Sequence, residues 1–436
     1  MSALHASNSI FRPHAAAAPV QYEQQIYQRG LEYERPPFTF KPKDWEAQAS
    51  SRMSAESEGY VVGNAGTGET ARKNREAFAR WSIIPQRLVR TAGLPDLSTQ
   101  ILGHHLQFPM ALAPVGVQRK YCTGCFGFVV VDTDPYSQGI FNPDGEKATA
   151  RAAAEQNVPY IMSTASSTSI EDVAEANGDG IRWFQLYWPQ NDDNEITASL
   201  LRRAKRAGFT ALVVTLDTYI LGWRPSDMDN GYNPFLRSDQ IGVAIGFSDP
   251  VFRSQFKARH GKDIEDDMHT AAAEWTRTVF PAISHDWDDI AFLQENWDGP
   301  IVLKGIQTVE DAKKCVELGI QGIVVSNHGG RQVDGGVSSL AVLPRIVEAV
   351  GDHIDIIFDS GIRCGADLAK ALALGAKMCL IGRPYIYGLV LGGERGVGHV
   401  IRSLLGDLQL TLHLAGIKSC DGQDLNRDKL VKECDI

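Results

Sequence analysis

Eight short apolar segments, each followed by a stretch with helical periodicity, constrain the fold of this 436-residue chain more than any other feature. Segments this uniformly apolar are typical of strands buried on both faces, as in a parallel sheet. Eight strand-then-helix units are the number in a (β/α)8 TIM barrel. A doubly wound sheet is the alternative, but it would more often show a glycine fingerprint after its first strand, where this chain has Ala113-Pro114-Val115-Gly116. The expected strands are residues 109–114, 158–162, 181–186, 211–216, 300–303, 322–325, 355–358 and 378–381.

This α/β barrel is expected to carry additions at its N-terminus and in two of its loops. Residues 1–45 are polar and punctuated by proline, which predicts an extended N-terminal arm, and residues 46–436 are expected to form one domain. That domain begins with an N-terminal helical extension at residues 45–95. Residues 225–285 form a long loop after the fourth strand without a clear strand pattern, a candidate lid over the barrel mouth. Residues 119–140 interrupt the first strand-to-helix connection.

Composition limits the partners of the chain. The formal net charge of −10 disfavours nonspecific binding to nucleic acid or an anionic membrane, but it permits a small anionic substrate in a cationic pocket. No apolar run reaches the ~18–20 residues that cross a bilayer. Seven scattered cysteines do not resemble a disulfide framework, so a cytoplasmic location is expected, with a mitochondrial one left open. Cys122 and Cys125 form a CxxC pair without partners, so no metal site is expected.

Polar or charged residues directly follow most of the expected strands, and in a barrel these positions meet at one rim. Each one alone has a structural explanation, because Asp or Ser can cap the next helix and glycine can permit a turn. Their convergence on one rim favours a binding or catalytic site over eight separate structural roles. The residues expected at this rim, with the glycines and the one valine among them, are Val115, Gly116, Ser163, Gln185, Tyr187, Thr215, Asp217, Lys304, Ser326, His328, Arg331, Asp359, Gly361, Arg363, Gly382 and Arg383.

The ends of the last two strands predict a phosphate site. Gly361 and Gly382 offer backbone N–H groups, and Arg363 and Arg383 offer guanidiniums suited to bidentate phosphate contacts. Barrels frequently bind phosphate at this place, after strands seven and eight. Asp359 is anionic, so it is better suited to a ligand hydroxyl than to the phosphate itself.

The ends of strands four to six predict an acid–base site. His328 stands in a glycine-rich segment that lets the backbone approach a ligand, and Asp217 is suited to orient it. Arg331 and Arg224 are suited to clamp a carboxylate, and Lys304 to stabilise negative charge that develops on a ring. A phosphate-bearing ring, a carboxylate clamp and a histidine base together indicate flavin-dependent oxidation of a hydroxy acid.

These motifs resemble those of the FMN-dependent 2-hydroxy acid oxidases and dehydrogenases, the family of glycolate oxidase and lactate oxidase. The most specific motif is Ser-Asn-His-Gly-Gly-Arg-Gln at 326–332, supported by Phe-Gln-Leu-Tyr at 184–187 and Leu-Ile-Gly-Arg-Pro at 380–384. The resemblance spans about Tyr60 to Ala415. Within the family the chain looks most similar to lactate 2-monooxygenase, because of the motif at 216–225, the enlarged segment after it, and Gly116 where many oxidases have alanine.

The resemblance implies a role for each residue that matches a family motif. His328 removes a proton as the substrate is oxidised, and Asp217 supports it. Tyr187 contacts the substrate hydroxyl or the developing carbonyl, and Lys304 stabilises reduced FMN. The residues expected to bind substrate are Tyr60, Tyr187, Arg224, His328 and Arg331.

FMN is the cofactor that the resemblance implies. Its residues would contact the isoalloxazine ring through side chains, pack backbone against the ring, or hold the ribityl phosphate. The side chains expected at the isoalloxazine ring are Ser163, Gln185, Thr215, Lys304 and Ser326. The backbone expected against the ring is that of Val115 and Gly116. The residues expected to hold the ribityl phosphate are Asp359, Gly361, Arg363, Gly382 and Arg383.

The implied reaction is oxidation of a small L-2-hydroxy acid with oxygen as acceptor. A lid that traps the keto acid leads to lactate 2-monooxygenase chemistry, which gives acetate, carbon dioxide and water. The alternatives are a peroxide-forming oxidase, a dehydrogenase with another acceptor, and a non-catalytic FMN-binding scaffold. The resemblance also implies a homotetramer or homo-octamer.

Two departures from the family pattern stand out. Ala165 occupies a position where glycolate oxidase has tryptophan, which either is a neutral change in the wall or makes room for a substrate side chain. Residues 119–140 have no family counterpart. They are either a surface loop or a retained intervening sequence in the gene model, and Arg119-Lys120-Tyr121 is compatible with a splice-donor codon sequence.

Overall fold

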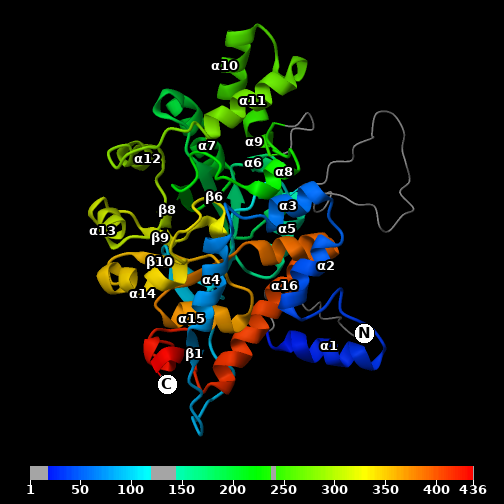
Figure 1. Ribbon diagram of the computed structural model, residues 1–436, viewed down its shortest axis with the longest axis vertical. Helices are drawn as coiled ribbons and strands as arrows, with labels where there is room; N and C mark the ends of the chain where they lie inside the picture. The colour runs from blue at the N-terminus through cyan, green and yellow to red at the C-terminus, as the bar shows by residue number, and fades with distance from the viewer. Residues whose placement is uncertain (1–17, 119–143, 237–241, 436) are drawn as a thin grey trace, which may run out of the picture.

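The computed structural model describes residues 18–118, 144–236 and 242–435, and a closed barrel of eight parallel strands lies at its centre (Figure 1). Neighbouring strands pair in chain order, and the last strand pairs with the first through Cys379 and Met110. Each strand overlaps a segment expected from the sequence, so the predicted TIM barrel is confirmed. The strands are β4 (Met110–Leu112), β5 (Tyr160–Ser163), β6 (Arg182–Tyr187), β7 (Leu212–Thr215), β8 (Ile301–Ile306), β9 (Gly322–Val325), β10 (Asp355–Phe358) and β11 (Met378–Ile381).

The N-terminal end of the barrel is closed by a hairpin of β2 (Thr99–Ile101) and β3 (His104–Leu106). Ile101 and Leu106 form one buried cluster with side chains from the barrel strands, among them Val213 and Val324. The backbone N–H of Leu102 donates to the carboxylate at the start of β10, at 2.6 Å. With this end sealed, the C-terminal end of the barrel remains for a ligand.

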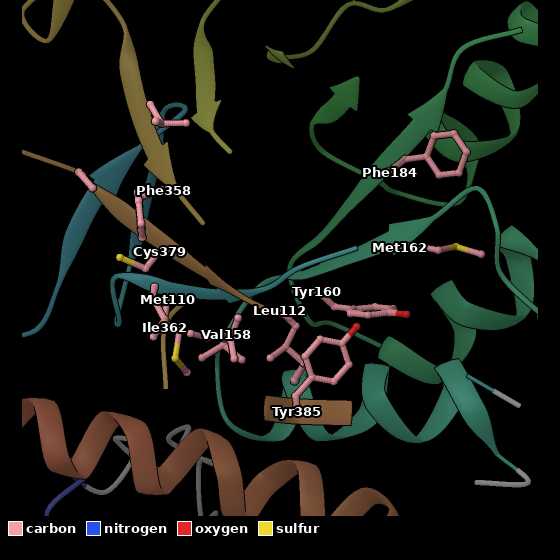
Figure 2. Packing of buried hydrophobic residues seen from close by; sticks show 14 of the residues in the cluster. Met110, Leu112, Val158, Tyr160, Met162, Phe184, Phe358, Ile362, Cys379 and Tyr385 are labelled. Atoms are coloured by element: carbon pink, nitrogen blue, oxygen red, sulfur yellow. The ribbon is translucent and has the colours of Figure 1, made fainter. Parts of the chain in front are cut away.

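The other side chains of the strands pack against the surrounding helices. Figure 2 shows this layer, with Met162 and Phe184 on neighbouring strands and the rings of Tyr160 and Tyr385 close together. The Nε2 of Gln118 lies 3.3 and 3.2 Å from the two tyrosine hydroxyls, in position to donate to them. Burial on both faces explains why the strand segments are apolar throughout.

A helix lies in every connection between consecutive strands, and one follows the last strand. Ser169 and Thr308 cap two of these helices through side-chain oxygens that accept from the N–H groups of Asp172 and Asp311. Within the described ranges, no helix has both the length and the apolar character needed to cross a bilayer. The helices outside the β7–β8 connection are α5 (Gly145–Glu155), α6 (Ile170–Asn177), α7 (Asn194–Arg206), α13 (Val309–Glu317), α14 (Ser339–Val350), α15 (Gly365–Ala373) and α16 (Arg383–Leu414).

The long segment between β7 and β8 is helical, and its described residues contain no strand, as predicted. α10 and α11 project from one end of the molecule (Figure 1). Asp249 caps α10 by accepting from the N–H groups of Val251 and Phe252, both at 3.0 Å. The five helices are α8 (Pro225–Asp229), α9 (Ala244–Phe247), α10 (Pro250–His260), α11 (Met268–Val279) and α12 (Ile290–Asn296).

The expectation of an extended arm is wrong for residues Gln21–Leu31, which form helix α1. Tyr22 is buried against α16, where its hydroxyl lies 2.7 Å from Nδ1 of His399. This contact joins residues 377 positions apart, so no local sequence signal announces it. The helical extension is confirmed as α2 (Pro42–Ser50), α3 (Ala55–Val62) and α4 (Glu69–Ala79), and the expected boundary at residue 45 falls inside α2. β1 (Trp81–Ile83) pairs with β12 (Leu430–Lys432) near the C-terminus.

Candidate active site

A cavity lies at the C-terminal end of the barrel, and residues at or after the ends of all eight strands line it. It contains about 1040 Å³ of empty space, including the part open to solvent. The convergence of the strand ends on one rim is therefore confirmed. The predicted site residues that line it are Tyr60, Val115, Gly116, Tyr187, Arg224, Lys304, His328, Arg331, Asp359, Gly361, Arg363, Gly382 and Arg383.

His328 reaches the cavity through a strained turn after β9. Its φ is +56°, a left-handed conformation that is uncommon for a residue with a side chain, and Gly329 and Gly330 continue it at +65° and +77°. Hydrogen bonds hold this turn. The N–H of His328 donates to Oγ of Ser326 at 3.1 Å, and that of Gly329 donates to Oγ of Ser360 at 3.0 Å. The two glycines explain the motif, because only glycine adopts this backbone at low cost.

The imidazole of His328 is oriented from behind by two neighbouring residues of the β7 loop. Its Nδ1 lies 2.8 Å from Oδ1 of Asp217 and 3.1 Å from Oγ1 of Thr218. The Thr218 hydroxyl also donates to Oδ1 of Asp217, at 2.8 Å. With Nδ1 bound to a carboxylate, the proton of neutral His328 is on Nδ1, and Nε2 is the basic nitrogen.

Burial and charge set the protonation states of this pair. Burial lowers the pKa of His328 below its ordinary value, while the Asp217 carboxylate opposes the shift and the Lys304 ammonium adds to it. Burial alone would raise the pKa of Asp217, but the charges of His328 and Lys304 hold it well below its ordinary value. His328 is thus a neutral base at physiological pH beside an ionised carboxylate, the arrangement that general-base catalysis requires.

Lys304 keeps its charge although it is buried. Burial would lower its pKa, but the Asp359 and Asp217 carboxylates outweigh this effect and raise it. Nζ donates to Oγ of Ser326 at 3.1 Å and lies 3.6 Å from Oδ2 of Asp359. The β8–β9 register shifts next to Lys304, where Gly305 has a φ of +110°. Such irregularities re-aim side chains near active sites.

Two guanidiniums, that of buried Arg224 and that of half-buried Arg331, lie together where the sequence predicts a carboxylate clamp. Arg224 donates through Nε to the carbonyl of Arg331 and through Nη2 to Oε1 of Gln332, at 3.1 and 2.8 Å. Arg331 donates to the carbonyl of Gly63 at 2.6 Å, with its guanidinium carbon 5.1 Å from the ring centre of Tyr60. Burial and the neighbouring guanidiniums lower the pKa of Arg331 to about 9, which leaves it charged at neutral pH.

The phosphate end of the cavity lies where β10 and β11 end. Arg383 donates to the carbonyls of Val61, Gly63 and Gly329 and to Oδ1 of Asn64, at 2.7 to 3.2 Å. A Cβ built on Gly382 would meet only Ala113, at 4.0 Å, so the backbone is open on that side. Gly382 also begins α16, whose first N–H groups have no side-chain cap. A helix N-terminus beside guanidiniums is suited to an anion such as phosphate.

Four of the predicted residues lie behind the cavity lining. Gln185 and Ser163 are buried together, with Oγ of Ser163 donating to Oε1 of Gln185 at 3.1 Å, while Ser326 and Asp217 support Lys304 and His328. Nε2 of Gln185 is buried and has no hydrogen-bond partner among the described residues, so it is a donor for a ligand. Thr215 borders a separate neighbouring cavity with Trp188, so the structure does not place it in the main one.

The structure adds residues that sequence reasoning missed. Phe235 and Phe280, from the two ends of the long β7–β8 segment, form an aromatic wall with Tyr187; the ring centres lie 5.3 and 5.0 Å apart. Asn74 on α4 exchanges two 2.8 Å side-chain hydrogen bonds with Asn327, next to the histidine. No spacing or motif signals these residues, because each is chosen by contacts distant in sequence.

The residues of the cavity fit FMN. Arg224 is buried and Arg331 and Arg383 are half-buried, and within the described ranges none of them pairs with a carboxylate at ion-pair distance, so they call for anionic ligand groups. The unpaired Nε2 donor of Gln185 lies behind the cavity wall. In that wall Gly116 exposes its backbone, and a Cβ added to Gly116 would lie only 2.7 Å from Cβ of Ala165. Lys304 supplies a cation between these ends. Backbone, donors and cations thus suit a flat ring with a phosphate tail.

Comparisons with known proteins agree with this geometry. The sequence model of the FMN-dependent dehydrogenase family matches residues 49–124 and 136–432. An FMN-dependent alpha-hydroxy acid dehydrogenase of Schizosaccharomyces pombe is 59% identical, over 96% of this chain and 98% of its own length. An L-lactate oxidase of Lysinibacillus sphaericus is 39% identical, over 88% and 92%. A solved structure of a mandelate oxidase variant with a C4a-OH-FMN adduct superposes with a TM-score of 0.71 at 33% identity, over 88% and 98%.

The family match is broken at residues 125–135, inside the segment 119–140 that departs from the family pattern. That segment lies outside the described residues, and whether it is a loop or a gene-model insertion stays a prediction to be checked on the transcript. On either side of the break the match is continuous and includes every site residue predicted from the sequence. The chain therefore belongs to the FMN-dependent 2-hydroxy acid oxidase and dehydrogenase family, and it is an oxidoreductase that uses FMN.

Proposed function

We propose that this enzyme oxidises a small L-2-hydroxy acid such as lactate with oxygen as the acceptor. The observation that carries the proposal is one cavity that His328, backed by Asp217, lines together with Arg224 and Arg331. A base and a carboxylate clamp in one cavity select a substrate that bears a carboxylate beside an oxidisable hydroxyl carbon.

Each residue has a task that follows from its geometry. Arg331 and Arg224 bind the carboxylate, and Tyr60 and Tyr187, whose pKa values burial raises, remain hydroxyl donors at neutral pH. Nε2 of His328 takes the hydroxyl proton, and Asp217 stabilises the imidazolium that results. FMN, when bound, would accept the Cα hydrogen together with the two electrons, and oxygen would then take both electrons and two protons to become hydrogen peroxide. Lys304 supplies a fixed positive charge for the extra electrons.

The aromatic wall supports a lactate 2-monooxygenase outcome. Phe235 is nearly fully buried, and Phe280 packs on it and on Tyr187, so the two ends of the β7–β8 segment enclose the substrate side of the cavity. An enclosed site retains the keto acid while peroxide forms, and peroxide then decarboxylates it. For lactate the balance is lactate plus oxygen to acetate, carbon dioxide and water.

A peroxide-releasing oxidase is the second candidate, and the 39% identity to an L-lactate oxidase supports it. The two functions share the clamp, the base and the first oxidation. They differ in whether the keto acid leaves before peroxide reacts with it. A dehydrogenase with another acceptor is the third, in line with the name of the S. pombe relative.

Two measurements on the purified holoenzyme distinguish these functions. Anaerobic mixing with a panel of L-2-hydroxy acids should bleach the flavin with lactate, and His328→Gln should abolish bleaching while it retains FMN. Aerobic turnover of L-lactate should then yield acetate and carbon dioxide in equal amounts. Pyruvate and peroxide in full yield would refute the monooxygenase outcome, and bleaching without reoxidation by air would refute oxygen as the acceptor.

The cytoplasmic location and the homotetramer or homo-octamer remain proposals that rest on sequence alone. Fractionation of the source cells checks the location. Size-exclusion chromatography with light scattering checks the oligomer, whose protomer mass is 47.8 kDa.

A further inference from the structure

A second cavity, which we call the basic vestibule, adjoins the phosphate end of the active site. It is larger than its neighbour, with about 1850 Å³ of empty space including the part open to solvent. It lies between α2, α4 and the start of α16, which are neighbours in Figure 1. Arg363 and Arg383 line both cavities, so the vestibule leads from solvent to the residues expected to hold the FMN phosphate. The charged residues that line it are Lys41, Lys43, Glu46, Arg72, Arg75, Arg363 and Arg383.

The charge of the vestibule is strongly positive although the chain as a whole carries −10. Six of its seven charged lining residues are cationic. Arg72 and Arg75 are partly neutralised by Glu76 and Asp367, at 2.5 and 2.7 Å. Glu46, the one acidic lining residue, accepts a hydrogen bond from Tyr387.

Lys41 and Lys43 lie on the solvent-exposed side of this cavity. Both lie at the start of α2 and are exposed, and neither side chain makes an ion pair with a described carboxylate. They create a positive potential at the solvent side of the path to Arg363 and Arg383.

We propose that the basic vestibule is the capture site for the phosphate of FMN during cofactor loading. Lys41 and Lys43 attract the phosphate from solution, and Arg363 and Arg383 hold it once the ring is in place. The proposal concerns how the cofactor binds, so it does not depend on which substrate or acceptor the enzyme uses.

The physical basis is electrostatic steering. A local potential of one sign raises the association rate of an oppositely charged ligand by about 10- to 1000-fold, and salt abolishes much of this gain. Removing two of six cations should remove part of it, about 3- to 10-fold at low ionic strength. The dissociation rate should stay the same, because the residues that hold the bound phosphate are unchanged.

The experiment measures flavin association with the full-length apoprotein by stopped-flow quenching of flavin fluorescence. The test variant is Lys41→Ala/Lys43→Ala. The matched control is Lys313→Ala/Lys418→Ala, which removes the same net charge at exposed positions that do not line the vestibule. Each protein is mixed with FMN and with riboflavin, which lacks the phosphate, over about 10–500 mM salt. Equal circular dichroism and full reconstitution with FMN establish that the apoproteins are folded.

The expected result is a 3- to 10-fold slower association of FMN with the test variant at low salt. The difference should disappear at high salt, and riboflavin and the control variant should show no effect. Unchanged FMN association in the test variant overturns the proposal. An equal loss for riboflavin overturns it as well, because the effect would not act on phosphate. A change in the FMN dissociation rate alone would mean that Lys41 and Lys43 hold bound FMN and do not speed its association, and this result also overturns the proposal.

Discussion

Replacing Asp217 with asparagine is the sharpest test of how the catalytic base is set up. The carboxylate lies 2.8 Å from Nδ1 of His328, and both side chains are largely shielded from solvent, with exposed fractions of 16% and 17%. Asparagine retains the size and an acceptor oxygen but removes the charge. A hydrogen bond to a charged group contributes about 1.5–3 kcal/mol. At roughly 1.4 kcal/mol per tenfold change, the anaerobic flavin reduction rate should fall about 10- to 150-fold.

The pH dependence of kcat/KM should also change in Asp217→Asn, in a direction that a general loss of structure does not predict. Oxidation requires neutral His328, so kcat/KM rises with pH through the pKa of His328, which burial already places below its ordinary value. The Asp217 carboxylate raises that pKa, so its removal lowers it further. The acid limb of the profile should therefore shift to lower pH while the plateau falls.

Thr218→Val is the matched control, because it removes a hydroxyl that contacts both members of the pair but leaves the charge. A neutral hydrogen bond contributes about 0.5–1.5 kcal/mol, so the plateau should fall about tenfold at most and the acid limb should stay in place. FMN content from the visible spectrum confirms that each variant is loaded. An acid limb of Asp217→Asn at higher pH, or an unchanged plateau, would refute this account of the base.

Three further substitutions test other parts of the site. Arg331→Met removes a half-buried cation from the clamp, so kcat/KM should fall roughly 100-fold, about 3 kcal/mol, while FMN content is unchanged; steady-state kinetics measures it. Asn74→Ala removes two of the hydrogen bonds of the Asn327 side chain and should lower the free energy of unfolding by about 1–3 kcal/mol in denaturant titrations of the holoenzyme; an unchanged value would refute the role of this pair. Phe280→Ala opens the aromatic wall, so the ratio of peroxide to acetate from L-lactate should rise; an unchanged ratio would exclude Phe280 from product retention.

The sequence by itself determined the barrel and most of the site. Strands buried on both faces must be apolar along their length, which made all eight recognisable, and parallel strands bring their ends to one rim. The turn after the sixth strand could also be predicted from the two glycines that follow His328, because only glycine adopts a left-handed backbone at low energetic cost. Arg224 and Arg331 were predicted from their places after the fourth and sixth strands and from the family motifs at 216–225 and 326–332.

The tertiary structure decided what depends on contacts between distant residues. Asn74 reaches Asn327 across 253 positions, and the helix that begins at Gln21 is held by a side-chain contact with α16. Phe235 and Phe280 meet over the cavity because the β7–β8 segment folds back on itself, and Thr215 borders a different cavity from the one that most of the predicted site residues line. Local patterns record burial and backbone conformation, whereas the partner of a side chain is chosen by packing, which exists only once the whole chain has folded.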